Sequence, residues 1–344
     1  MKSIRFFPLL KNSILLAFGA GLLVAAPLRA DLNSDLAFTA FSNVDVNALA
    51  GGQILQARGG LLAFHRAITA ESLFIINATP TQVQDKLLHW NPATHSELKV
   101  WIHKSLPAQP TPADFSGLKD LPDNSSVDYL LNATANLDPA NPALQLSKSE
   151  AQMIIPLRAQ TRDRKALLVN FWSQVLAGRA TRFLGGNGAA DNYVISGGDI
   201  QPLSEIKSLF QTNPKVNQEY RGILGQTPVE SSTKALPADI YYESFDVEGG
   251  ATMGTGVTYQ AGNGTSIQSI DIEYYDSASL YVSIELEQLW PITVNGKNET
   301  LVWRNDLVST SNVAYLHGTE RLASGMIMLQ DVKQAINAFR TEFK

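Results

Sequence analysis

The sequence predicts an α+β fold in which a curved antiparallel sheet packs against a long C-terminal helix, with a helical region in the middle of the chain. Residues 239–309 form alternating or apolar runs separated by turn residues, which is typical of consecutive strands. Residues 319–343 carry apolar side chains at helical spacing. Residues 147–183 begin with a capping box and are followed by two glycines, and both signals are typical of a helical region.

The first 30 residues have the pattern of a secretory signal peptide. Positive charge lies at Lys2, Arg5 and Lys11, ahead of an apolar run from Ile14 to Ala26. This run is shorter than the ~20 residues that a retained membrane anchor needs. We expect cleavage after Ala30, with Ala26 as the alternative, and export to a bacterial periplasm or beyond it.

Composition limits the partners of the remaining chain. The 27 basic and 32 acidic residues give a net charge of −5, and removing the four basic residues of the first 30 lowers it to −9. An acidic chain is poorly suited to nucleic acid, because phosphate neutralisation supplies most of that affinity. No later stretch is apolar over the ~18 residues of a membrane span. Cysteine is absent, which excludes disulfides and thiolate metal sites.

An N-terminal extension, residues 31–51, precedes the first elements of the main domain, residues 52–104. Residues 53–58 and 66–77 read as two strands bounded by glycine. A helix should follow, because Thr79 can cap it, Pro80 suits its first position and Gln82 completes a capping box. Residues 97–104 alternate between apolar and polar side chains and predict a half-buried strand.

The middle of the chain changes character twice. Residues 105–146 carry six prolines among Asn, Asp and Ser, so we expect a long connection or insertion. Residues 147–224 form the helical region, which includes a shorter helix at 202–211 that opens with Pro202.

The last part, residues 225–344, should hold the antiparallel sheet and the C-terminal helix. The expected strands are residues 239–247, 251–260, 265–275, 279–289, 292–294 and 300–309. Asn295-Gly296 between the last two is a strong hairpin signal, and a meander is the expected topology. The helix at 319–343 must bury its apolar stripe, and the preceding sheet offers the surface.

This order of elements resembles the helix-grip fold of the START and polyketide-cyclase-like superfamily. The segment SLFIINATPTQVQDKLLHW at residues 72–90 is similar to the opening strand of that superfamily, which passes through a Thr-Pro or Ser-Pro turn into the first helix. The resemblance covers about half of the chain without its first 30 residues. It implies a cavity between the curled sheet and the last helix, with room for an apolar or amphipathic, lipid-like small molecule. The side chains that we expect to line this cavity are Tyr281, Trp290, Trp303, Met326 and Phe339.

No motif assigns a catalytic residue, a metal site or a cofactor. The histidines 89, 95 and 103 lie close in sequence but match no compact metal signature, so we interpret them as surface residues. Acidic residues are frequent in the expected sheet, and their alternation with apolar residues favours a solvated face. They are Glu243, Asp246, Glu248, Asp271, Glu273, Glu285 and Glu287.

The sequence therefore leaves three functions open. The first is an exported protein that binds the small molecule described above. The second is an envelope interaction protein without a ligand, in which residues 105–146 contact a partner. The third, with the least support, is a hydrolase that uses sheet carboxylates as acid and base.

Overall fold

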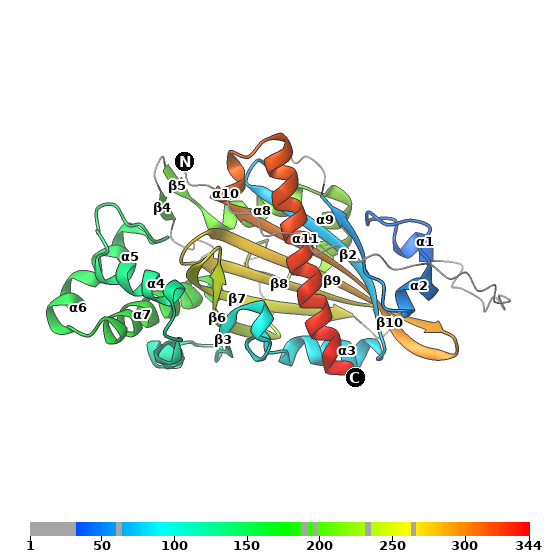
Figure 1. Ribbon diagram of the computed structural model, residues 1–344, viewed down its shortest axis with the longest axis horizontal. Helices are drawn as coiled ribbons and strands as arrows, with labels where there is room; N and C mark the ends of the chain where they lie inside the picture. The colour runs from blue at the N-terminus through cyan, green and yellow to red at the C-terminus, as the bar shows by residue number, and fades with distance from the viewer. Residues whose placement is uncertain (1–31, 60–63, 187–191, 196–197, 231–234, 263–265) are drawn as a thin grey trace, which may run out of the picture.

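The sheet is the centre of the molecule. The structure is a computed structural model that describes residues 32–59, 64–186, 192–195, 198–230, 235–262 and 266–344, so the expected signal peptide lies outside the described residues. Eight antiparallel strands form an open sheet in the order β1-β2-β10-β9-β8-β7-β6-β3. The predicted α+β class is confirmed, with the long last helix lying across one face of the sheet (Figure 1).

Strands β6 to β10 form the predicted meander, because each pairs with the next one along the chain. β2 extends the sheet beside β10, and β3 extends it beside β6. The residues predicted as two strands, 279–289 and 292–294, form one continuous strand, which turns at Asn295-Gly296. Both turn residues have positive φ, as this tight hairpin requires. The strands are β1 Leu55–Arg58, β2 Ala67–Ile76, β3 Val100–Ser105, β6 Asp239–Val247, β7 Gly250–Gly262, β8 Ile267–Asp276, β9 Leu280–Val294 and β10 Lys297–Thr310.

The first long helix, α3 (Pro80–His89), begins where the sequence predicts. The Gln82 side chain accepts hydrogen bonds from the Thr79 backbone and hydroxyl at 2.9 and 3.0 Å, which completes the capping box. Two 3-10 turns, η1 (Pro92–Thr94) and η2 (Ser96–Leu98), then lead into β3. The predicted strand at 97–104 therefore begins three residues later than expected.

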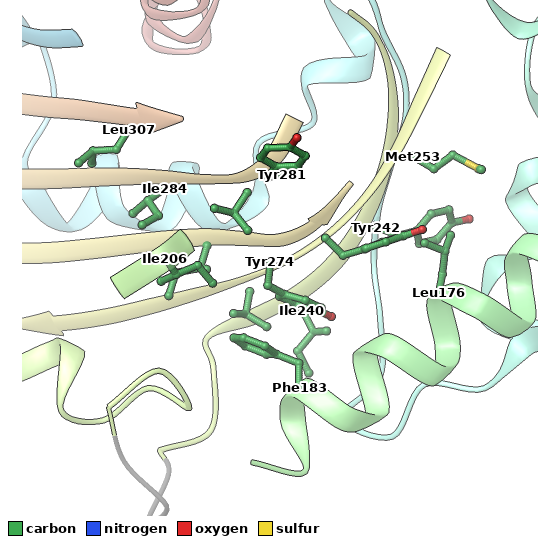
Figure 2. Close-up of a cluster of buried hydrophobic side chains, with 14 of the residues drawn as sticks. Leu176, Phe183, Ile206, Ile240, Tyr242, Met253, Tyr274, Tyr281, Ile284 and Leu307 are labelled. Carbon is green, nitrogen blue, oxygen red and sulfur yellow. The ribbon is translucent and has the colours of Figure 1, made fainter. Parts of the chain in front are cut away.

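One face of the sheet carries most of the helices and the larger hydrophobic core. Figure 2 shows part of this core, where Phe183 of α7 lies against Tyr274 of β8 with ring centroids 3.9 Å apart. The short strands β4 (Tyr193–Ile195) and β5 (Gly198–Ile200) form a separate pair. The helices are α1 Leu32–Asp35, α2 Val46–Ala50, α4 Ser125–Ala135, α5 Lys148–Gln152, α6 Ile154–Gln160, α7 Arg164–Leu184, α8 Pro202–Gln211, α9 Pro214–Leu224 and α10 Ser311–Ala314.

Residues 105–146 differ from the expected long connection. They contain a 3-10 helix, η3 (Pro112–Asp120), and the helix α4. Phe115, Leu118 and Leu130 are fully buried in the larger core, and Thr134 of α4 accepts a hydrogen bond from Trp172 of α7. Pro112 lies at the start of η3 and Pro122 follows its C-cap, so these two prolines mark the boundaries of that helix.

The opposite face of the sheet carries α11 (Gly318–Arg340) and the closing turn η4 (Thr341–Phe343). A second, smaller hydrophobic core fills the space under the C-terminal half of α11. There Val332, Ile336 and Phe339 pack against Phe74 and Val302 of the sheet. No helix in the described part of the chain is both long and apolar enough to cross a membrane.

Candidate functional site

The sheet face beneath α11 is polar along most of β6 to β10. Side chains alternate along a strand, and the residues between the apolar positions of the larger core therefore point toward the α11 side. We call this surface the carboxylate face. Its acidic residues are Asp239, Glu243, Asp271, Glu273, Asp276, Glu285, Glu287 and Asp306.

Three carboxylates lie directly opposite one another on neighbouring strands. Asp271 of β8 is paired with Glu285 of β9, and Glu285 is paired with Asp306 of β10. Facing residues on adjacent strands have their Cβ atoms about 5 Å apart, and like charges in this arrangement repel. A row of this kind persists only if protons or a cation reduce its charge.

Arg304 of β10 supplies part of that compensation. Its guanidinium donates to Asp306 at 2.6 Å and to Glu285 at 2.6 Å, and a second contact to Glu285 measures 2.5 Å. Arg304 is also the cross-strand partner of Glu287. Within the described part of the chain, Arg304 and His103 are the basic side chains that form ion pairs with this face. The carboxylate face therefore carries more acidic than basic side chains.

Hydroxyl groups hold the Asp271 carboxylate in place. Tyr241 and Thr258 each donate a hydrogen bond of 2.6 Å, one to each carboxylate oxygen. The ring of Tyr241 fits over Gly256, where a Cβ atom would lie 2.3 Å from the ring. Glycine at this position therefore allows the tyrosine to reach Asp271.

A second glycine makes room for two more carboxyl groups. A Cβ atom on Gly254 would lie 1.8 Å from Glu273 Oε1 and 3.0 Å from Asp276 Oδ1. Glu273 accepts a hydrogen bond from Ser283 at 3.1 Å through its other oxygen. Next to this pair, His103 Nδ1 lies 3.1 Å from Glu243 Oε2.

Burial shifts the protonation of this face toward the neutral acid. It raises the pKa of Asp271 to about 6, although the two hydroxyl donors oppose the rise. It also raises the pKa of Glu287 to about 7, against the effect of Arg304. The pKa of Glu273, Asp276 and Glu285 is raised well above the usual value for the same reason. Clusters of such perturbed acids are typical of functional sites.

Solvent still reaches part of the carboxylate face. The Glu285 side chain is 31% exposed, and those of Arg304 and Asp306 are each 12% exposed. At the other end of the face, His103 and Glu243 are 18% and 17% exposed. The solvated face expected from the sequence is nevertheless wrong for Glu273 and Glu287, which are both 5% exposed.

The structure does not bring the five predicted lining residues together. Tyr281, Trp290 and Trp303 belong to the larger core on the opposite face, and Met326 is 67% exposed on the outside of α11. Phe339 alone of the five lies between α11 and the sheet, where it packs against Trp90. The helix-grip pattern does not reveal which residues of a strand face the helix, because a shift of one residue turns every side chain to the other side of the sheet.

Sequence reasoning missed four members of the carboxylate face, one of which is Asp239. Asp276, Arg304 and Asp306 were not singled out, although Arg304 and Asp306 have the two-residue spacing that places side chains on one side of a strand. The three neighbouring histidines are separate. His89 pairs with Asp85, His95 with Glu342 and Glu97, and His103 with Glu243.

No group of three or more His, Asp or Glu side chains among the described residues is arranged to hold a metal ion. Comparison of the chain with protein-family models, with curated proteins and with solved structures finds no match.

Proposed function

We propose that this chain is an exported binding protein, and that its ligand is an amphipathic small molecule with a cationic end. The observation that carries the proposal is the row of Asp271, Glu285 and Asp306 on three adjacent strands, with more acid than Arg304 can neutralise. An ammonium group would relieve their repulsion, and its hydrogen bonds to partly buried carboxylates are of the strong, charge-assisted kind.

The apolar part of the ligand has a matching surface on α11. Met328 and Leu329 are only partly buried and pack against the smaller core. The C-terminal half of α11 offers no room, because Leu289, Val302 and Ile336 are each at most 1% exposed. The ligand that the helix-grip resemblance implies would therefore lie beside this packed region, with its charge over the acidic row.

Binding of three twelve-carbon probes tests the proposal. Dodecylammonium should bind the purified protein in isothermal titration calorimetry, whereas dodecanol and laurate should bind at least tenfold more weakly. The double variant Glu285→Gln, Glu287→Gln should lose most of the ammonium affinity. Glu320→Gln makes the same chemical change on an exposed residue of α11 and should leave the affinity unchanged. Equal binding of the three probes would refute the proposal.

A hydrolase that uses the same carboxyl groups is the second candidate. It is favoured by one observation, which is that burial raises the pKa of Asp271 to about 6 and that of Glu287 to about 7. A carboxyl group whose pKa is raised in this way can hold a proton near neutral pH and act as a general acid. Hydrolysis of aryl glycosides that disappears in Glu287→Gln would support this candidate over simple binding.

A further inference from the structure

A pocket of about 460 Å³ lies on the side of the sheet opposite α11, at the end of the β9–β10 hairpin. Its walls come from three parts of the chain that are distant in sequence. These are the N-terminal helices α1 and α2, the start of α3, and both strands of the hairpin. Its volume lies within the range of small-molecule sites, which is about 300–1,000 Å³.

The pocket contains a carboxyl oxygen that the described part of the chain leaves without a hydrogen-bond partner. Glu299 of β10 is 7% exposed, and its Oε2 atom has no hydrogen-bond partner among the residues that the structure describes. Buried polar atoms in folded proteins almost always have a partner, so this oxygen needs an explanation. Burial raises the pKa of Glu299, and the charge of Lys297 only partly opposes the rise. Glu299 is therefore a buried acceptor that lines a hollow space.

The rest of the lining combines apolar side chains with four polar residues, which are Asp35, Thr79, Thr293 and Asn298. Leu32, Val46, Pro80, Trp290, Pro291 and Ile292 form the apolar part. Thr293 and Asn298 are exposed at the rim, and their side chains bond to each other at 3.3 Å. Trp290 is 5% exposed and packs against Phe38, which fixes this wall.

We infer that this pocket binds a small primary ammonium ion with a short apolar chain, through a hydrogen-bonded ion pair with Glu299. An ammonium group supplies three hydrogen-bond donors and the positive charge that balances the buried carboxylate. The apolar lining removes the attached carbon chain from water. An alcohol of the same length offers one donor and no charge, and a carboxylic acid offers repulsion. The site is separate from the carboxylate face and does not depend on the proposed function.

The test uses n-butylammonium, n-butanol and butyrate with the purified protein, followed by the ¹H–¹⁵N signal of the Trp290 indole. Butylammonium should shift this signal in a saturable manner, and butanol and butyrate should bind at least tenfold more weakly. Glu299→Gln should weaken butylammonium binding at least tenfold. Thr293→Trp should do the same by closing the rim, and because Thr293 is exposed this variant should fold normally.

Two results would overturn the inference. One is equal binding of butanol and butylammonium, and the other is unchanged butylammonium affinity in both variants. Glu285→Gln serves as the control, since it alters the carboxylate face and should leave the Trp290 shift intact. A lost shift in Glu285→Gln would place the ammonium on the carboxylate face and not in the pocket. Lowering the pH from 7 to 4 should also weaken binding, because Glu299 must be ionised.

Discussion

Replacing Gly254 by alanine should destabilise the protein far more than an ordinary glycine substitution. The added Cβ atom would lie 1.8 Å from Glu273 Oε1 and 2.8 Å from Glu273 Cδ. Glu273 cannot move into solvent easily, because it is 5% exposed, and its neighbour Asp276 is fully buried. Overpacking of this kind costs about 2 kcal/mol. Displacing Glu273 also breaks its hydrogen bond with Ser283, which adds about 1 kcal/mol.

The free energy of unfolding of Gly254→Ala should therefore fall by about 3 kcal/mol. Urea unfolding followed by circular dichroism measures it through the midpoint, provided that the slope stays constant. Gly222→Ala is the matched control. Gly222 lies in the helix α9 with no atom within 4 Å of its added Cβ, so alanine should stabilise by about 0.5–1 kcal/mol there. A Gly254→Ala midpoint equal to that of the unaltered protein would show that the Glu273 carboxyl does not occupy this space.

Three further predictions concern acidity, an ion pair and a helix cap. Lowering the pH from 7 to 5 should raise the free energy of unfolding by on the order of 2 kcal/mol. The reason is that Asp271 and Glu287 take up protons in the folded chain over this range, whereas in the unfolded chain they do so only near pH 4. Urea midpoints measured against pH test this, and a flat profile would contradict it. Arg304→Met should lower the free energy of unfolding by about 3 kcal/mol at pH 7, because two carboxylates lose their cation. This loss of stability should be smaller at pH 5. Thr79→Ala should lower the free energy of unfolding by about 1 kcal/mol, because the capping box of α3 is lost. Thr81→Ala, two residues later, should change the urea midpoint little.

Local signals in the sequence were sufficient for most elements of the fold. The Thr79-Pro80 start of α3 and the Asn295-Gly296 hairpin are set by chemistry within four residues, and both are confirmed. The last helix was placed by its apolar periodicity, which is also local. The helices η3 and α4 within residues 105–146 were not predicted, because a proline at a helix start resembles a proline in a loop until packing against α7 shows the difference.

The candidate site could not be predicted in the same way, because its burial depends on contacts distant in sequence. Glu285 and Glu287 alternate with apolar residues, a pattern equally consistent with a wet face and with a face under a second layer. Their environment depends on residues of other elements, such as Arg304 on the next strand. The aromatic residues predicted to line a ligand cavity do not lie together for a related reason. Residue type alone does not indicate on which face of a strand a side chain lies.

The last prediction separates a stabilising role of the carboxylate face from a binding role. Buried acids that repel one another do not strengthen a fold, and replacing buried charges by neutral groups of similar shape is often neutral or stabilising. The double variant Glu285→Gln, Glu287→Gln keeps the side-chain shapes and removes two ionisable groups, so its urea midpoint at pH 7 should stay the same or rise by an amount equivalent to about 1 kcal/mol. The same variant should lose ammonium binding. A gain in stability together with a loss of binding is expected where function maintains an arrangement that is unfavourable for stability. A loss of several kcal/mol together with unchanged binding would instead show that these carboxylates support the fold through Arg304.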